Sequence, residues 1–329
     1  MKVSLNLKKL LMLLLFPLYL NNINAEELNK NKRITITAVG DVMLDYHLNE
    51  ILKANGYAYP FENTADYLKE VDITFCNLEA PLTTSKDIIK KEWNFKAEPE
   101  AIKSLIYAGI DVVSLANNRI LDYGIKGLEE TIKQLDAHSI KYVGTWNGKE
   151  REPLIVEKNG LRTAFLAYSG VHPESFKAQK NKLGVIPALL EYIKTDVKKA
   201  KNLADIVIVS FHFGRELSKE PNYYQIERAR LAIDSGADIV IGHHPHVLQP
   251  LEYHKDSLIA YSLGNFVFGC YNKVKESAIL KINISKDNIE ELDIVPVNIY
   301  NFEVIFQPRI LDGESKKRVL EFMLGDKLN

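Results

Sequence analysis

The residues of this chain with the clearest chemical potential are the three histidines of Gly242-His243-His244-Pro245-His246. They follow residues 237–241, an apolar run that is typical of a buried strand. Imidazole is the commonest transition-metal ligand in proteins. Loops at the ends of the strands of an α/β sheet can be polar and still be held rigidly. The segment therefore predicts a metal site, and the alternative is a polar loop without ligands.

Other apolar runs also end in groups that could bind a metal. They are Asp41 after residues 33–39, Glu79 after 71–77, Asn117 and Asn118 after 111–116, and His212 at the end of 205–212. Together with His244 and His246, these groups are expected to point toward one edge of a sheet. Carboxylate, amide and imidazole ligands suit Mn, Fe or Zn, and the lack of cysteine ligands argues against a structural zinc site. A carboxylate that bridges two cations would let them activate one water.

Strands must alternate with helices to position these groups. Helices are expected at residues 99–108, 127–138, 189–202, 223–234 and 318–324, and further strands at 140–143, 154–157, 163–168, 238–241, 258–262, 278–284 and 292–299. Asn159-Gly160 is a strong hairpin-turn signal between two of the strands. The alternation, followed by paired strands, predicts a mixed α/β fold with a β-rich C-terminal part. Residues 26–329 are expected to form one domain.

Composition excludes some partners. The chain has 329 residues, 46% of them hydrophobic, and a formal net charge of -1. Nucleic-acid binding is driven by clustered basic surface, so a nearly neutral chain argues against that partner. Cys76 and Cys270 are far apart in sequence, and two independent thiols are expected rather than a disulfide.

The N-terminus has the pattern of an export signal. Lys2, Lys8 and Lys9 precede an apolar run over residues 10–20, and a polar stretch ends at the small residue Ala25. A run of about 11 residues is short for a membrane span, which takes about 20. Residues 1–25 are therefore interpreted as a signal peptide, with an uncleaved membrane anchor as the alternative. Both interpretations place the rest of the protein outside the cytoplasm, in the periplasm or at the cell surface.

Six segments taken together resemble a known family. They are AVGDVML (38–44), NLEAP (77–81), SLANN (114–118) with DYG (122–124), SFHFG (210–214), GHHPH (242–246) and YSLGNF (261–266). In this order they are similar to the motifs of the CapA (PgsA) family of poly-γ-glutamate capsule synthesis, which is itself similar to the calcineurin-like metallophosphoesterases. The resemblance spans about residues 34–268.

The resemblance implies a four-layer α/β/β/α sandwich and a set of metal ligands. Those ligands are Asp41, the bridging carboxylate Glu79, Asn118, His212, His244 and His246. His243 occupies a position where the metallophosphoesterase motif has glycine. The implied cofactors are one or two divalent ions. The implied partners are the anionic polymer and membrane-bound capsule synthesis proteins.

The chain departs from the metallophosphoesterase pattern at two positions. Met43 stands where a histidine ligand is usual, and His47 is a weak substitute. Arg119 follows Asn118 where the resemblance leads us to expect a histidine that assists the leaving group. Arginine stays charged and cannot shuttle a proton, but it can neutralise an anionic oxygen. The alternative role for Arg119 is an ion pair with Asp122.

Several neighbouring residues have two interpretations each. Asp122 is a candidate site residue beside Arg119 or a helix cap, and Glu216 could line the cleft. Asn265 could contact His246 or shape a turn. Trp93 and Phe95 could form a lip over the site, or pack as an exposed loop. His138, His172 and His254 are expected at the surface or in turns.

Two functions remain open from the sequence. The first is a cell-envelope component of poly-γ-glutamate capsule synthesis or export, whose metal cleft binds or handles the polymer. The second is an active two-metal hydrolase of phosphate esters or of the amide bonds of the polymer. Arg119 and Met43 favour the first function, and the retained ligand set favours the second.

Overall fold

The computed structural model describes residues 32–325, and its first sheet has eight strands in the order β16-β15-β14-β1-β2-β3-β4, with β13 also paired to β1. The strands are β1 (Arg33–Met43), β2 (Ile73–Leu78), β3 (Val112–Ser114), β4 (Lys141–Val143), β13 (Asn265–Phe268), β14 (Glu276–Ser285), β15 (Ile289–Asn298) and β16 (Arg309–Ile310). Strands β1 to β4 and β13 run parallel, so their carboxyl ends meet at one edge.

The second sheet has six strands in the order β11-β12-β10-β9-β7-β6. They are β6 (Leu154–Lys158), β7 (Leu161–Ser169), β9 (Ile206–His212), β10 (Ile239–His243), β11 (Leu251–His254) and β12 (Ser257–Ala260). Strands β7, β9, β10 and β12 are parallel. The hairpin predicted at Asn159-Gly160 joins β6 to β7, and both turn residues have positive φ. A small third sheet pairs β5 (Thr145–Trp146) with β8 (Gly184–Val185).

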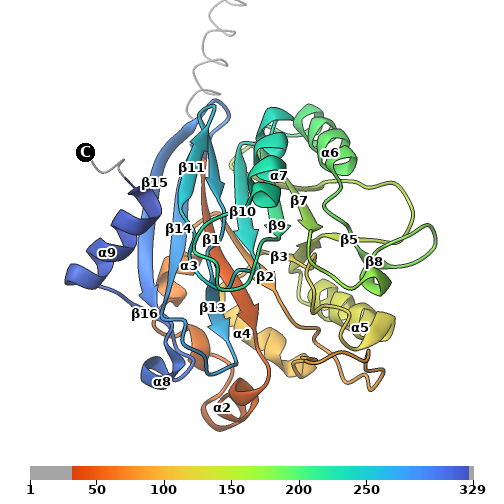
Figure 1. The fold of residues 1–329 in the computed structure, drawn as a ribbon, viewed down its shortest axis with the longest axis vertical. Helices are drawn as coiled ribbons and strands as arrows, with labels where there is room; N and C mark the ends of the chain where they lie inside the picture. Colours follow the sequence, from red (N-terminus) through yellow and green to blue (C-terminus); the bar gives the residue numbers. More distant parts are fainter. Residues whose placement is uncertain (1–31, 326–329) are drawn as a thin grey trace, which may run out of the picture.

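Eight α-helices and three short 3-10 turns complete the described chain (Figure 1). The helices are α2 (His47–Asn55), α3 (Ala65–Lys69), α4 (Ile102–Ala108), α5 (Gly124–Ala137), α6 (Leu190–Leu203), α7 (Tyr223–Asp234), α8 (Asn301–Val304) and α9 (Gly313–Leu324). In the region described, none of these helices has both the length and the apolar character needed to cross a bilayer.

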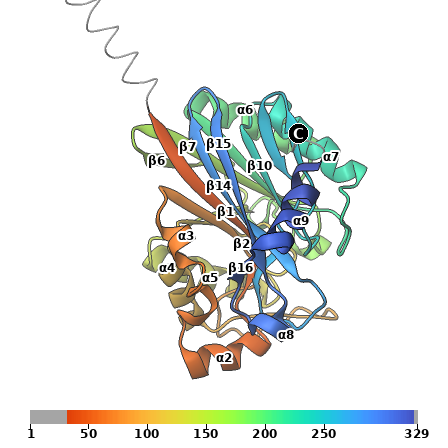
Figure 2. The same ribbon diagram turned by 90° about the vertical axis from the view of Figure 1, so that its left-hand side faces the viewer.

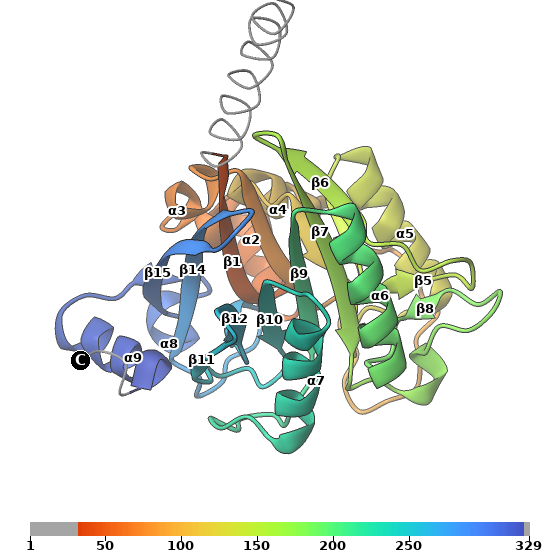
Figure 3. The same ribbon diagram turned by 90° about the horizontal axis from the view of Figure 1, so that it is seen from above.

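Alternating side chains bury both faces of each sheet. Ile36 and Phe75 of the first sheet share a core cluster with Ile208 and Ile241 of the second, so the two sheets pack face to face. The outer face of the first sheet packs on α2, α3, α4 and α5. The outer face of the second packs on α6 and α7, which Figure 3 shows on the side opposite α4.

The mixed α/β fold class and the β-rich C-terminal part are confirmed. The sequence did not predict several elements that are short or follow directly on another element: α2, α3, α8, β5, β8, β11, β13 and β16. Helix α9 packs Val319 and Met323 into the core between the sheets. Figure 2 shows α2 and α8 together at one end of the molecule. The predicted signal at residues 1–25 lies outside the described residues.

Candidate metal centre and cleft

The six predicted ligands lie close together where β1, β2, β3, β9 and β10 end. His212 Nε2 is 3.1 Å from Asn118 Oδ1 and 3.7 Å from Glu79 Oε1. His246 Nδ1 is 3.6 Å from Asp41 Oδ2, and the rings of His212 and His244 have centroids 4.8 Å apart. Both sheets therefore contribute to one cluster, whereas the sequence pattern predicted one edge of a single sheet: β1, β2 and β3 belong to the first sheet, and β9 and β10 to the second.

A glycine and a strand irregularity position Asp41. A Cβ atom on Gly40 would lie 1.9 Å from the carbonyl oxygen of Gly264, so only glycine permits this approach. The approach lets the Asp41 N–H donate to Gly264 O at 2.9 Å. The register of β1 with β2 also shifts between Ala38 and Asp41. Such irregularities change the direction in which a side chain points, and here Asp41 is turned into the cluster.

Two buried asparagines support the cluster through hydrogen bonds. Asn77 donates through Nδ2 to Asp41 Oδ1 at 2.8 Å, and Asn117 donates to Asn77 Oδ1 at 3.0 Å. The Asn117 side chain also accepts the N–H groups of Arg119 and Ile120. Asn117 thus shapes the turn that presents Asn118, while Asn118 is the member that contacts His212.

A third asparagine supports the histidine loop. Asn265 Oδ1 accepts a hydrogen bond from His246 Nδ1 at 2.8 Å. Asn265 begins β13, which pairs with the end of β1 at Asp41. The contact between Asn265 and His246 is therefore present, as one of the two interpretations of Asn265 predicted.

The hydrogen bonding of the cluster fits a cation. Glu79 is fully buried, yet neither of its carboxylate oxygens has a hydrogen-bond partner among the described residues. The buried Nδ1 atom of His244 is also without a partner there. A buried carboxylate with no partner is costly unless a positive charge lies beside it. The residues present therefore fit a divalent metal ion.

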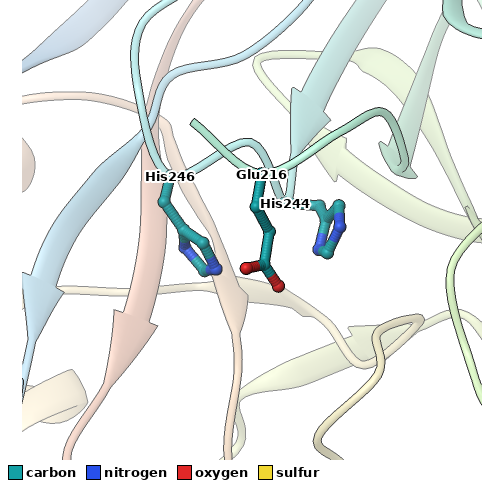
Figure 4. Close-up of side chains that lie close together, drawn as sticks. All are labelled: Glu216, His244 and His246. Atoms are coloured by element: carbon teal, nitrogen blue, oxygen red, sulfur yellow. The ribbon is translucent and has the colours of Figure 1, made fainter. Parts of the chain in front are cut away.

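Two groups of ligand atoms are close enough to share an ion. One consists of Asp41, Glu79 and His246, and the other of Glu216, His244 and His246; within each group the ligand atoms lie within 4.8 Å of one another. Figure 4 shows the Glu216 carboxylate between the two imidazoles. His246 belongs to both groups, so the two positions are adjacent.

The sequence placed Glu216 only near the cleft, whereas the structure groups its carboxylate with His244 and His246. Its loop is fastened to the histidine loop, because Leu217 N–H donates to Pro245 O at 2.8 Å. Buried Gln249 also donates to the carbonyl oxygen of Ser218 at 2.9 Å. The signal in the sequence was its position four residues after His212.

Met43 and His47 do not supply the absent ligand. Met43 is fully buried in an apolar cluster with Ala80, Phe95 and Phe268. His47 begins α2, where its ring packs on Tyr46 and Tyr271. Among the described residues, neither belongs to a group of potential ligands.

Burial and charge set the protonation of the cluster. Burial raises the pKa of Glu79 well above its usual value, and the charge of Asp41 raises it further. Burial lowers the pKa of His212 far below its usual range and that of His244 to about 4, and in each case a neighbouring histidine adds to the shift. Burial would also raise the pKa of Asp41, but the contact with His243 and the charges of three histidines lower it below its ordinary range. His212 and His244 are therefore neutral at physiological pH, as metal ligands must be.

A cleft of about 520 Å³ opens beside the cluster, lined in part by Asn118, Arg119, Trp93, His172 and Glu216. Arg119 donates through Nη1 to Trp93 O at 2.8 Å, and its guanidinium lies 5.0 Å from the Phe95 ring centre. Trp93 is half exposed and forms part of the lip. Phe95 is buried instead, so the prediction of exposed packing is wrong for it. His172 lies in the cleft wall rather than at a free surface.

Asp122 has a different partner from those predicted. Its side chain is fully buried and pairs with Lys91 rather than with Arg119. It also accepts the N–H of Phe95 at 2.9 Å, and it does not cap α5, which begins at Gly124 without a side-chain cap. Lys91 in turn donates to Asn118 O at 2.7 Å. Asp122 and Lys91 therefore hold the lip and the Asn118 turn together. Cys76 and Cys270 are both free, as predicted.

The chain is similar to known capsule proteins over most of its length. The model of the bacterial capsule synthesis protein family PGA_cap matches residues 35–270. The chain is 36% identical to the capsule biosynthesis protein CapA of Bacillus anthracis, covering 82% of this chain and 68% of that protein. It is 31% identical to the PGA biosynthesis protein CapA of Bacillus subtilis (strain 168), covering 89% and 78%.

A solved structure is also similar in part. The 5'-nucleotidase precursor from Thermus thermophilus aligns with a TM-score of 0.48 and 10% identity over 85% of this chain and 54% of that one. The match of the family model extends from β1 through β13 and includes every residue of the metal cluster. The chain therefore belongs to the bacterial capsule synthesis family PGA_cap.

Proposed function

We propose that this protein acts in the cell envelope in poly-γ-glutamate capsule synthesis and binds the anionic polymer at a divalent-metal cluster. The observation that supports the metal is the buried Glu79 carboxylate, whose two oxygens have no hydrogen-bond partner among the described residues. The polymer is suggested by the relatives, one of which is named a PGA biosynthesis protein. Polymer carboxylates and a metal cluster attract each other electrostatically.

The proposed ligands are Asp41, Glu79, Asn118, His212, Glu216, His244 and His246. Asp41, Glu79 and His246 form one group, and Glu216, His244 and His246 form the other. Asn118 and His212 contact each other beside Glu79. Mn, Fe and Zn all suit this mixture of oxygen and nitrogen donors. When bound, two such ions can polarise an acidic or carbonyl oxygen and activate a water between them.

Arg119 is proposed to bind and orient an anionic group in the cleft. Its guanidinium is held by the Trp93 carbonyl and the Phe95 ring at the cleft wall. A fixed guanidinium forms strong charge-assisted hydrogen bonds to carboxylates, but it does not release a proton at physiological pH. This residue favours binding of the polymer over rapid hydrolysis. Asp122 is proposed as a positioning residue, because its buried carboxylate reaches Lys91 and the lip rather than the cleft.

A two-metal hydrolase is the second candidate function. It is favoured by two close approaches: Glu79, directly after β2, lies near His212 of β9, and Asp41 of β1 lies near His246 in the loop after β10. In that case a phosphate ester or a polymer amide would occupy the same cleft. The two candidates differ in whether the cleft turns its ligand over.

The test is capsule formation in a poly-γ-glutamate producer whose own relative of this gene is deleted and replaced by the full chain. The variants Glu79→Gln and His244→Ala are expected to lose capsule, while His254→Ala is the matched control because His254 pairs with Asp234 away from the cluster. Metal content of the same purified proteins is measured in parallel. Capsule formation by Glu79→Gln and His244→Ala at the level of the control would contradict the proposal.

Residues 1–25 are proposed to be a signal that exports the domain over residues 26–329. N-terminal sequencing of the envelope-associated protein is expected to begin at Glu26. A start at Met1 or Lys2 would instead identify an uncleaved anchor.

A further inference from the structure

A second hollow of about 310 Å³ lies beside the histidine loop, and no role for it follows from the metal cluster. We propose that this hollow binds a further stretch of the anionic polymer, next to the segment that lies at the metal cluster. The inference rests on the proposed function for the identity of the polymer. The residues that line the hollow are not among the proposed metal ligands.

The hollow is lined by four cationic side chains and one carboxylate. Arg318 pairs with that carboxylate, Glu276. Lys219, Lys273 and Lys275 are exposed, and in the described part of the chain no carboxylate lies within ion-pairing distance of any of them. Lys219 and Lys275 lie over the rings of Phe322 and Tyr300 instead. The hollow therefore has excess positive charge and favours an anion.

Part of the lining of the hollow is apolar. It consists of Val247, Leu248, Val274 and Phe322, of which Leu248 and Val274 are buried. Poly-γ-glutamate carries one carboxylate per residue, with two methylene groups and an amide between successive carboxylates, so it offers both charge and apolar contact. An inorganic polyanion such as polyphosphate matches the cations but leaves the apolar lining unused. The lining thus fits an oligomeric carboxylate better than polyphosphate.

Two loops connect this hollow to the metal cluster. Glu216 lines the first cleft and Lys219 lines the second, and the two residues are only three positions apart along the chain. Three residues span at most about 11 Å, so the two hollows lie close together. Val247 of the second hollow also directly follows His246 of the cluster. Arg119 supplies positive charge to the first cleft, whose lining also includes Glu92 and Glu216, and the lysines supply it to the second.

An anionic polymer that enters both hollows would gain affinity with length. A short oligomer reaches only one hollow, whereas a longer one binds both, and the second contact becomes intramolecular. The experiment therefore compares oligo-γ-glutamates of about four and about 20 residues, by calorimetry on the full metal-loaded chain in detergent. The long oligomer is expected to bind at least about tenfold more tightly per molecule.

The variant Lys273→Glu/Lys275→Glu tests the second hollow directly. It is expected to weaken binding of the long oligomer about tenfold and binding of the short oligomer less than about twofold. The matched control is Lys133→Glu/Lys194→Glu, which changes the net charge equally on the exposed surfaces of α5 and α6. Metal content, measured for all variants, is expected to stay unchanged.

The outcomes separate this inference from the proposed function. If the wild type binds the long oligomer and the lysine variant weakens no more than the control, the second hollow is not a polymer site and only this inference fails. If the wild type binds neither oligomer, the proposed function itself fails. Polyphosphate of equal length that binds as tightly, and loses as much in the lysine variant, would contradict a role for the apolar lining.

Discussion

His243 Nδ1 lies 3.2 Å from Asp41 Oδ1, and neither side chain has any solvent-exposed surface. The contact joins the end of β10 in the second sheet to the end of β1 in the first. The backbone N–H of the next residue, His244, points to the other Asp41 oxygen at 3.3 Å. His243 is not among the proposed ligands, but it holds one of them in place.

Removal of this imidazole is expected to destabilise the protein. His243→Ala would leave a cavity beside Phe75 and would remove one polar neighbour of the buried Asp41 carboxylate, which keeps its hydrogen bond from Asn77. Truncation of a buried side chain to alanine costs about 2–5 kcal/mol. Urea unfolding of the metal-free full chain measures the loss. His254→Ala, which removes an imidazole nearer the surface, should cost less than about 1 kcal/mol; equal losses in the two variants would contradict a special role for His243.

Glu79→Gln is expected to have opposite effects with and without metal. In the metal-free protein, burial and repulsion from Asp41 disfavour the ionised carboxylate, as its raised pKa shows. Removal of its charge should therefore increase the unfolding free energy, on the order of 1 kcal/mol, as is common where a functional group is held at the expense of stability.

With metal bound, Glu79→Gln should instead be less stable than the wild type. A ligand at about 100 times its Kd stabilises the folded state by about 2.7 kcal/mol, and this gain requires the Glu79 carboxylate. Thermal unfolding with Mn²⁺ and after chelation measures both effects, with exposed Glu129→Gln as the control. A Mn²⁺-dependent rise in melting temperature that is as large in Glu79→Gln as in the wild type would exclude Glu79 as a ligand.

The residues of the cluster could be identified from the sequence, but the residues that hold them in place could not. Asp41 and Glu79 could be predicted to meet, because the parallel strands β1 and β2 of one sheet end at the same edge. His212 comes from the second sheet, so its approach depends on how the two sheets pack. The role of His243 could not be predicted, since it depends on β10 pairing with β9 so that His243 lies opposite His212 on the face toward the other sheet. Lys91 and Asp122 are 31 positions apart in two loops. Their pairing depends on tertiary packing, for which neither periodicity nor turn signals give evidence.

Asp122 is expected to make stability depend on pH in the weakly acidic range. Burial raises its pKa to about 6, and the Lys91 charge only partly opposes the shift. Because the folded-state pKa lies above the usual value of 3.8, the folded protein binds this proton more tightly than the unfolded chain does. The contribution of Asp122 to the unfolding free energy is fully present below about pH 4. It is lost as the pH rises through about 6, by up to about 3 kcal/mol.

Unfolding free energies at several pH values between about 4 and 7 test this for Asp122→Asn against the wild type. Asp122→Asn lacks the titrating carboxyl group. Its unfolding free energy should therefore fall less, or rise more, than that of the wild type between about pH 4 and 7. Asp87→Asn, in the loop that carries Lys91, serves as the control for loss of an exposed carboxylate. Parallel pH profiles for Asp122→Asn and the wild type would show that Asp122 does not titrate in this range.

The last prediction separates polymer binding from hydrolysis and concerns Arg119. General acid–base help contributes about 10²–10⁴-fold to catalysis, and an arginine at this position cannot supply it. The metal-loaded wild type should therefore hydrolyse an activated phosphodiester poorly, and Arg119→His should raise the turnover while the metal content stays constant. Substitution of Asp41 or His244 should reduce capsule formation more than a change in the turnover of the phosphodiester does. Arg119→Lys keeps the charge but not the bidentate geometry, so it serves as the control for charge alone. Fast hydrolysis by the wild type, slowed in Arg119→His, would instead identify Arg119 as an electrostatic catalyst and favour the two-metal hydrolase.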